Sequence, residues 1–165
     1  KLVVSGINLG GNLGICALYS GTVSAATEAM VMGVPSIAVS LDTYENPDFI
    51  PAAKFARKFI PQLLKKGLPD GVVLNINVPP VPESKFVGVA ITRQGKSRVI
   101  EEFDRREDPR GRTYYWLAGE MLFEETEEGA DCVMIAKKYI SIAPIHFDLT
   151  HYPSIDKLKD WKIEL

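Results

Sequence analysis

The sequence predicts an α/β fold built mainly on parallel strands, and its N-terminal part carries this prediction. A short apolar run at residues 2–4 leads into a loop over residues 8–22 that is rich in glycine, asparagine and hydroxyl side chains. Residues 22–32 then repeat apolar side chains at helical spacing, and a second apolar run follows at residues 35–40. Strand, loop, helix and strand in this order form a βαβ unit, which implies parallel strands.

Capping and helix-breaking residues set the limits of the next elements. Ser20 or Thr22 is the expected N-cap of the first helix, and Gly33 is its expected C-terminal stop. Residues 49–66 form an amphipathic helix whose cations lie toward the C-terminal end, and Pro61 is expected to kink or divide it. These signals are local, so they predict where each helix begins and ends.

A third buried strand is expected at residues 72–78, with Asn75 and Asn77 on one face. The prolines that follow mark a subdomain boundary, with the α/β core at residues 1–82 and a smaller region at residues 83–165. The elements expected in that region are strands at 86–92 and 139–145, a hairpin with arms 97–103 and 113–117 around 104–112, an acidic loop at 119–129, and a terminal helix at 154–161.

Composition excludes several classes of protein. With 165 residues and a net charge of −2, the chain can bury a sizeable core and is not a general binder of nucleic acid. No apolar run approaches the roughly 20 residues that a membrane-spanning helix needs. Cys16 and Cys132 lie far apart in apolar surroundings, which favours a reducing compartment, the cytoplasm. The chain has no signal peptide and no initiating Met, as expected of a start inside a longer protein.

The loop over residues 8–22 is the candidate ligand site, because it lies where the first strand is expected to end. It has no carboxylate, histidine or lysine, so it suits an anion such as phosphate but does not run a reaction alone. Asn8 can offer an oxygen to a hard divalent cation, or cap its own turn. Asn12, Ser20 and Thr22 can hold phosphoryl oxygens, or cap the turn and the helix.

Other motifs fit less well. No Gly-Lys-Ser/Thr follows the loop, and Leu9 stands where a dinucleotide fingerprint needs glycine. A hydrolase triad of Ser20, Asp148 and a histidine, or a zinc site from Asp148 and the histidines 146 and 151, departs from the usual spacings. The aromatic run at residues 114–116 indicates a subunit interface on the hairpin, or rings that cover the core.

Three segments together resemble the SurE family of acid-phosphatase-like nucleotidases. They are Ser-Gly-Ile-Asn-Leu-Gly-Gly-Asn-Leu-Gly at residues 5–14, Tyr-Ser-Gly-Thr-Val at 19–23, and Gly-Val-Pro-Ser-Ile-Ala at 33–38. The likeness extends through Leu-Asn-Ile-Asn-Val-Pro at 74–79 and Asp-Pro-Arg-Gly-Arg at 108–112 to the strand at 139–144. It therefore covers nearly the whole chain.

The resemblance implies a Rossmann-like three-layer α/β domain with a smaller part that mediates dimers and tetramers. It implies hydrolysis of nucleoside 5′- and 3′-monophosphates with one divalent cation, Mn²⁺ or Mg²⁺, per subunit. By this resemblance Asn8 is a metal ligand, Asn12 and Ser20 are catalytic and hold the phosphate, and Gly21 and Thr22 flank it. It implies neither a membrane nor a nucleic-acid duplex as partner.

The chain departs from the family pattern in one respect. The family's N-terminal Asn-Asp-Asp-Gly motif and a later serine, which supply its other metal ligands, are not in this sequence. The expectation is that the chain matches the C-terminal two-thirds of a SurE protein, as a fragment or with the remainder on a separate chain. Taken as complete, it would be a non-catalytic binding or oligomerisation module, because it has too few carboxylates to hold the cation.

Overall fold

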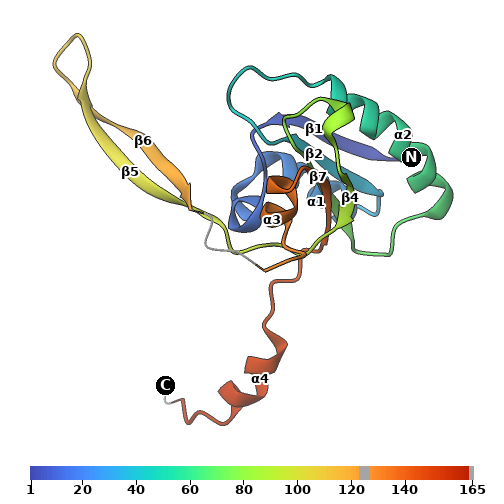
Figure 1. Cartoon of the computed structure of the whole chain (residues 1–165). Coiled ribbons are helices and arrows are strands. Elements are labelled where there is room, and N and C mark those ends of the chain that lie inside the picture. Colours follow the sequence, from blue (N-terminus) through green and yellow to red (C-terminus); the bar gives the residue numbers. More distant parts are fainter. Residues whose placement is uncertain (123–126, 164–165) are drawn as a thin grey trace.

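The computed structural model describes residues 1–122 and 127–163, and its strands form a five-stranded sheet and a separate two-stranded hairpin (Figure 1). The order of strands in the larger sheet is β1-β2-β3-β7-β4. In chain order the elements are β1 (Val3–Leu9), η1 (Gly14–Tyr19), α1 (Gly21–Val31), β2 (Ser36–Leu41), α2 (Ile50–Lys66), β3 (Val73–Val78), η2 (Glu83–Lys85), β4 (Gly88–Ile91), β5 (Arg98–Glu107), β6 (Thr113–Leu122), α3 (Asp131–Ala136), β7 (Tyr139–Ile145) and α4 (Tyr152–Lys159).

The predicted βαβ unit is confirmed. Strands β1 and β2 are parallel neighbours, and α1 connects them. Ser20 is the N-cap of α1, since its hydroxyl oxygen accepts the Val23 amide at 3.1 Å. Gly33 follows the helix with a φ of 77°, a left-handed conformation that glycine adopts without strain. The local capping signals therefore gave this helix to within one residue at each end.

Helices cover both faces of the sheet, which gives three layers. Ala38 of β2 and Val73 of β3 pack with Val23 and Ala26 of α1. The opposite face of the same two strands presents Ile37, Val39, Leu74 and Ile76. These side chains pack with Ala52 and Leu63 of α2. Every residue of β2 and β3 is buried, as expected of strands covered on two faces.

The second half of the chain returns to this sheet. Strand β7 lies antiparallel to β3, and β4 lies parallel to β7 at the edge. The sheet is thus mixed, with three parallel strands followed by two of the opposite direction. Residues 83–165 contribute these two strands together with the hairpin β5–β6 and helix α4, both of which extend away from the sheet in Figure 1.

Several boundaries differ from those expected. Strand β1 continues to Leu9, so Asn8 lies within it, because pairing with β2 reaches as far as Leu41. Helix α2 runs undivided through Pro61. The first arm of the hairpin extends to Glu107 and the second begins at Thr113. Only residues 108–112 are left for the turn. The charged stretch expected in the turn instead forms cross-strand pairs.

The acidic segment was only partly predicted. Residues 119–122 were expected in a loop but continue β6, because they pair with the first residues of β5. Residues 123–126, also assigned to that loop, lie outside the described residues. Helix α3 was not predicted, and the terminal helix begins at Tyr152 rather than at residue 154. None of the helices in the described ranges is long and apolar enough to cross a membrane.

Candidate functional site

Asn8 lies near the carboxyl end of β1, opposite Ser40 of β2. Its side-chain nitrogen donates to the carbonyl oxygens of Leu9 at 3.1 Å and Gly10 at 2.8 Å. These two bonds direct the nitrogen to the backbone of its own turn, and no donor among the described residues reaches the side-chain oxygen. Asn8 therefore caps its own turn while it keeps an oxygen available, so the two roles considered for it are compatible.

Asn12 is buried, with 6% of its surface exposed, and all its hydrogen bonds run to neighbouring strands. Its side-chain nitrogen donates to the Ser40 hydroxyl at 2.6 Å. Its backbone amide donates to the side-chain oxygen of Asn77 at 2.8 Å, and its carbonyl accepts from Asn75 at 2.8 Å and from Asn77 at 3.3 Å. The loop after β1 therefore crosses β2 and is fastened to β3.

The other predicted residues lie at the start of α1. The oxygen of the Ser20 hydroxyl accepts from Val23, which leaves its hydrogen available to donate. Gly21 and Thr22 are the first residues of the helix, where backbone amides have no acceptor within the helix. Ser20 is buried, Gly21 is exposed and Thr22 is half-buried. This end of α1 thus presents several donors and the positive end of a helix dipole.

Gly14, the first residue of η1, is hydrogen-bonded to residues that are distant in sequence. Its amide donates to Asp131 at 2.9 Å, and its carbonyl accepts from the Gln94 side chain at 2.8 Å. The other oxygen of Asp131 accepts the amide of Gly95 at 2.9 Å. Burial raises the pKa of Asp131, although these backbone donors act against that rise. Gly14 has a φ of 53°, and a side chain there would collide with Ser97.

A second carboxylate, Asp42, comes directly after β2 and beside the loop. It is half-buried, and a side chain on Gly11 would collide with it. Burial raises the pKa of Asp42, with no opposing hydrogen bond or ion pair from the described residues. Asp42 is therefore a carboxylate at the carboxyl end of a parallel strand, next to the loop.

The histidines have other partners. The ring of His146 accepts the Asp148 amide at 3.2 Å, and His151 pairs with Ser154 at 2.6 Å. Hydrogen bonds from Thr150, and then from Tyr152, lower the pKa of Asp148 to about 2. The Ser20 hydroxyl bonds to the start of its own helix, so the structure assembles no triad from these groups.

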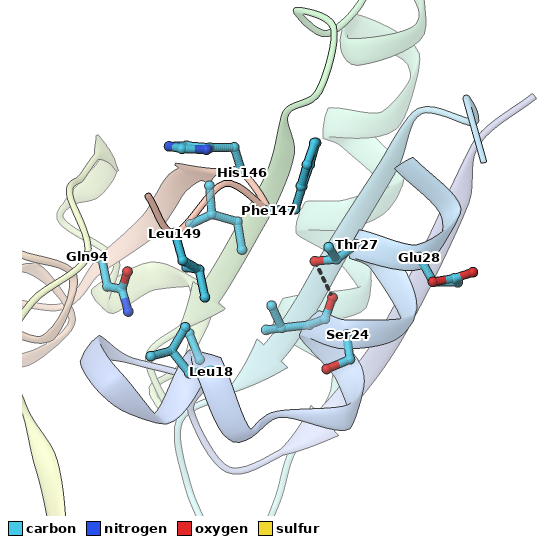
Figure 2. Close-up of a pocket in the computed structure, with 11 residues that line it drawn as sticks. Leu18, Ser24, Thr27, Glu28, Gln94, His146, Phe147 and Leu149 are labelled. Atoms are coloured by element: carbon cyan, nitrogen blue, oxygen red, sulfur yellow. Dashed lines mark hydrogen bonds between the residues drawn. The ribbon is translucent and has the colours of Figure 1, made fainter. Parts of the chain in front are cut away.

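His146 instead lines a pocket of about 360 Å³ between α1 and the segment after β7 (Figure 2). Leu18, Phe147 and Leu149 form much of its wall, with Thr27 and Gln94 also at its edge. Ser20 is not among its lining residues. Within the described ranges, no group of three histidine, cysteine or acidic side chains is placed to hold a metal, and this includes the zinc alternative.

Sequence reasoning missed several residues of this site. It placed Asn75 and Asn77 on one face of a strand but gave them no role, and it did not select Ser40, Asp42 or Asp131. A signal was present for the asparagines, because two amides in an otherwise apolar buried strand need partners. Asp42 was marked by its place directly after a buried strand. Nothing local pointed to Asp131, which lies 117 residues from Gly14.

Fold and site together define an α/β protein of Rossmann-like type, with a glycine- and asparagine-rich loop across the carboxyl ends of its parallel strands. The chain belongs to the SurE family, since the family model described as Survival protein SurE matches residues 1–101.

Similar proteins agree with this assignment. The chain is 49% identical over 162 residues to 5′-nucleotidase SurE of Syntrophobacter fumaroxidans, covering 98% of this chain and 65% of that one. It is 54% identical over 159 residues to 5′-nucleotidase SurE of Syntrophus aciditrophicus, covering 96% and 60%. The crystal structure of the SurE protein from Aquifex aeolicus superimposes with a TM-score of 0.80 at 40% identity, over 96% of this chain and 64% of that one. The chain thus spans less than two-thirds of the length of these relatives.

Proposed function

We propose that the full-length protein containing this chain is a metal-dependent phosphomonoesterase that hydrolyses nucleoside 5′- and 3′-monophosphates. The observation that carries the proposal is the set of donors at the start of α1, together with the side-chain oxygen of Asn8 in β1, which no donor among the described residues reaches. The relatives named 5′-nucleotidase supply the reaction class. The cytoplasm is the proposed location, since cysteines in apolar surroundings suit a reducing compartment.

The residues present fit a hard divalent cation in part. Asn8 directs its nitrogen to backbone carbonyls and leaves an oxygen, the type of ligand that Mn²⁺ and Mg²⁺ bind. One neutral oxygen does not hold a cation, so carboxylates have to complete the site. When bound, the ion supplies Lewis-acid polarisation of a phosphoryl oxygen.

Hydrogen-bond donors of this chain bind the phosphoryl group. The hydroxyl of Ser20 and the amides of Gly21 and Thr22 bind the phosphoryl oxygens and stabilise the charge that develops on them. The side-chain nitrogen of Asn12 also binds the phosphate. Its hydrogen bond to the Ser40 hydroxyl is then replaced by one to a phosphoryl oxygen. The helix dipole adds to this stabilisation because the site lies at the N-terminus of α1.

The protein assembles as a homodimer or homotetramer through its two projecting segments. Tyr115, Trp116 and Leu117 of the hairpin are each more than half exposed, as 63%, 55% and 57% of their surfaces face solvent. Helix α4 buries none of its residues. Exposed apolar side chains of this kind favour contact with a second copy. Size-exclusion chromatography with light scattering tests this, and a monomer at micromolar concentration would refute it.

The test of the enzymatic proposal is phosphate release from nucleoside monophosphates by the full-length gene product with Mn²⁺, with and without a chelator. Asn8→Ala is expected to weaken Mn²⁺ activation and to lower turnover by about 100-fold, a large loss for a ligand that contacts the ion. Asn8→Asp retains a side-chain oxygen but, like Asn8→Ala, loses the bonds to the Leu9 and Gly10 carbonyls, so it is the control for those two bonds. Unchanged Mn²⁺ affinity in Asn8→Ala would refute the ligand role. Nucleotide binding without turnover in the wild type would favour a binding module.

A further inference from the structure

We infer that Asn75 and Asn77 of β3 are positioning residues, which hold the loop between Gly10 and Gly14 in the shape that binds substrate. This inference rests on the proposed function. The two residues hydrogen-bond to the backbone of Asn12. They would therefore act on the reaction through the loop.

The hydrogen bonds show how the loop is held. Asn12 lies outside any strand, yet both its backbone groups are paired: its amide donates to Asn77 at 2.8 Å, and its carbonyl accepts from Asn75 at 2.8 Å. A second donor from Asn77 reaches the same carbonyl at 3.3 Å. Only a side chain with both an acceptor and a donor can bind the amide and the carbonyl of one residue, and Asn77 offers both in a short, planar form. Two side chains of β3 thus replace the neighbouring strand that the loop lacks.

Burying the side-chain amides of Asn75 and Asn77 destabilises the fold, which indicates that their role is to hold the loop. Asn75 and Asn77 are 1% and 0% exposed, and the other residues of β3 are apolar. The side-chain oxygen of Asn75 has no hydrogen-bond partner among the described residues. An apolar side chain in its place would avoid that unpaired buried atom, so folding alone does not account for the asparagine.

The register places this network level with Asn8. Asn8 pairs with Ser40, Ser40 with Asn77, and Asn77 with Ser141, so four polar residues form one row across the sheet. Ser40 also accepts from the side chain of Asn12 at 2.6 Å. Asn12 is therefore joined to β1 by the chain and to β2 and β3 by hydrogen bonds. A substitution at Asn75 or Asn77 therefore acts on the loop at Asn12, while Asn8 stays held in β1 by its pairing with Ser40.

The experiment compares Asn77→Ala with Ser36→Ala in the full-length protein. Ser36 is the matched control, because it is fully buried at the far end of β2 and its side chain makes a polar contact at 2.6 Å to the Ala26 carbonyl. Asn77→Ala is expected to lower kcat/KM for a nucleoside monophosphate by about tenfold or more and to weaken inhibition by inorganic phosphate in parallel. The Mn²⁺ activation constant should change by less than about twofold, since Asn77 binds Asn12.

Amide hydrogen exchange over residues 10–14 gives a readout besides activity. Exchange there should accelerate in Asn77→Ala and remain as in the wild type in Ser36→Ala. If Asn77→Ala does not fold, Asn75→Ala carries the same test with the Asn77 contacts intact. Loss of stability equal to that of Ser36→Ala, with unchanged kcat/KM, would overturn the inference. A wild-type protein that hydrolyses no nucleotide would instead refute the proposed function.

Discussion

The sheet and the two projecting segments, hairpin β5–β6 and helix α4, differ in how far their side chains are buried. In β2 and β3 every residue is buried, and the polar ones face the loop or α1. In the hairpin and α4, aromatic and aliphatic side chains stay exposed, among them Phe103 at 63% and Leu158 at 46%. The central strands β2 and β3 are thus covered by their own chain, whereas the projections leave apolar side chains exposed. The buried core and the proposed assembly surface therefore lie in separate parts of the fold.

The largest expected effect tests this division directly. Ile76→Ala removes a fully buried side chain between β2, β7 and α2, and should lower the free energy of unfolding by about 2–5 kcal/mol. Leu117→Ala, on the exposed hairpin, should change it by less than about 0.5 kcal/mol for the isolated subunit. Urea unfolding at a concentration that keeps the protein monomeric measures both. Equal losses would show that the hairpin is part of the folding core.

The next effect separates binding from stability at the start of α1. Ser20→Asp keeps an N-cap for the helix but places a negative charge against the phosphate, so kcat/KM should fall by about 100-fold with little change in Tm. Ser20→Ala should cost about 1 kcal/mol of stability through the lost cap, together with a smaller loss in kcat/KM. Thermal melts beside phosphate-release assays check both variants. Activity retained in Ser20→Asp would mean that Ser20 only caps the helix.

The smallest effect concerns Asp42. Because burial raises its folded pKa above the ordinary value of 3.8, its charged form destabilises the folded state at neutral pH. Asp42→Asn should therefore raise the free energy of unfolding at pH 7 by less than about 1 kcal/mol. The gain should shrink as the pH falls through the raised pKa and vanish below 3.8. Denaturant unfolding from pH 7 to pH 3 measures it, with exposed Asp70→Asn as control. A gain independent of pH would exclude charge burial as its cause.

Sequence reasoning succeeded where the cause was local. The cap at Ser20, the stop at Gly33 and the buried strand at Val73–Val78 all follow from neighbouring residues. It failed where the cause was a distant partner: Asn12 meets Asn77 across 65 residues. The length of the hairpin was underestimated because cross-strand pairing holds charged residues that look like a turn. Register between strands decides such contacts, and spacing in one sequence does not reveal it.

The carboxylate of Asp131 connects two segments that are distant in sequence. One of its oxygens holds Gly14, and the other holds Gly95, three residues before the hairpin begins. The two segments are therefore hydrogen-bonded to the same carboxylate. The amide of Ile15, bonded to the Ser97 carbonyl at 3.0 Å, gives a second tether in parallel. These contacts join the base of the hairpin to Gly14, so the hairpin and the loop are connected through Asp131 and Ile15.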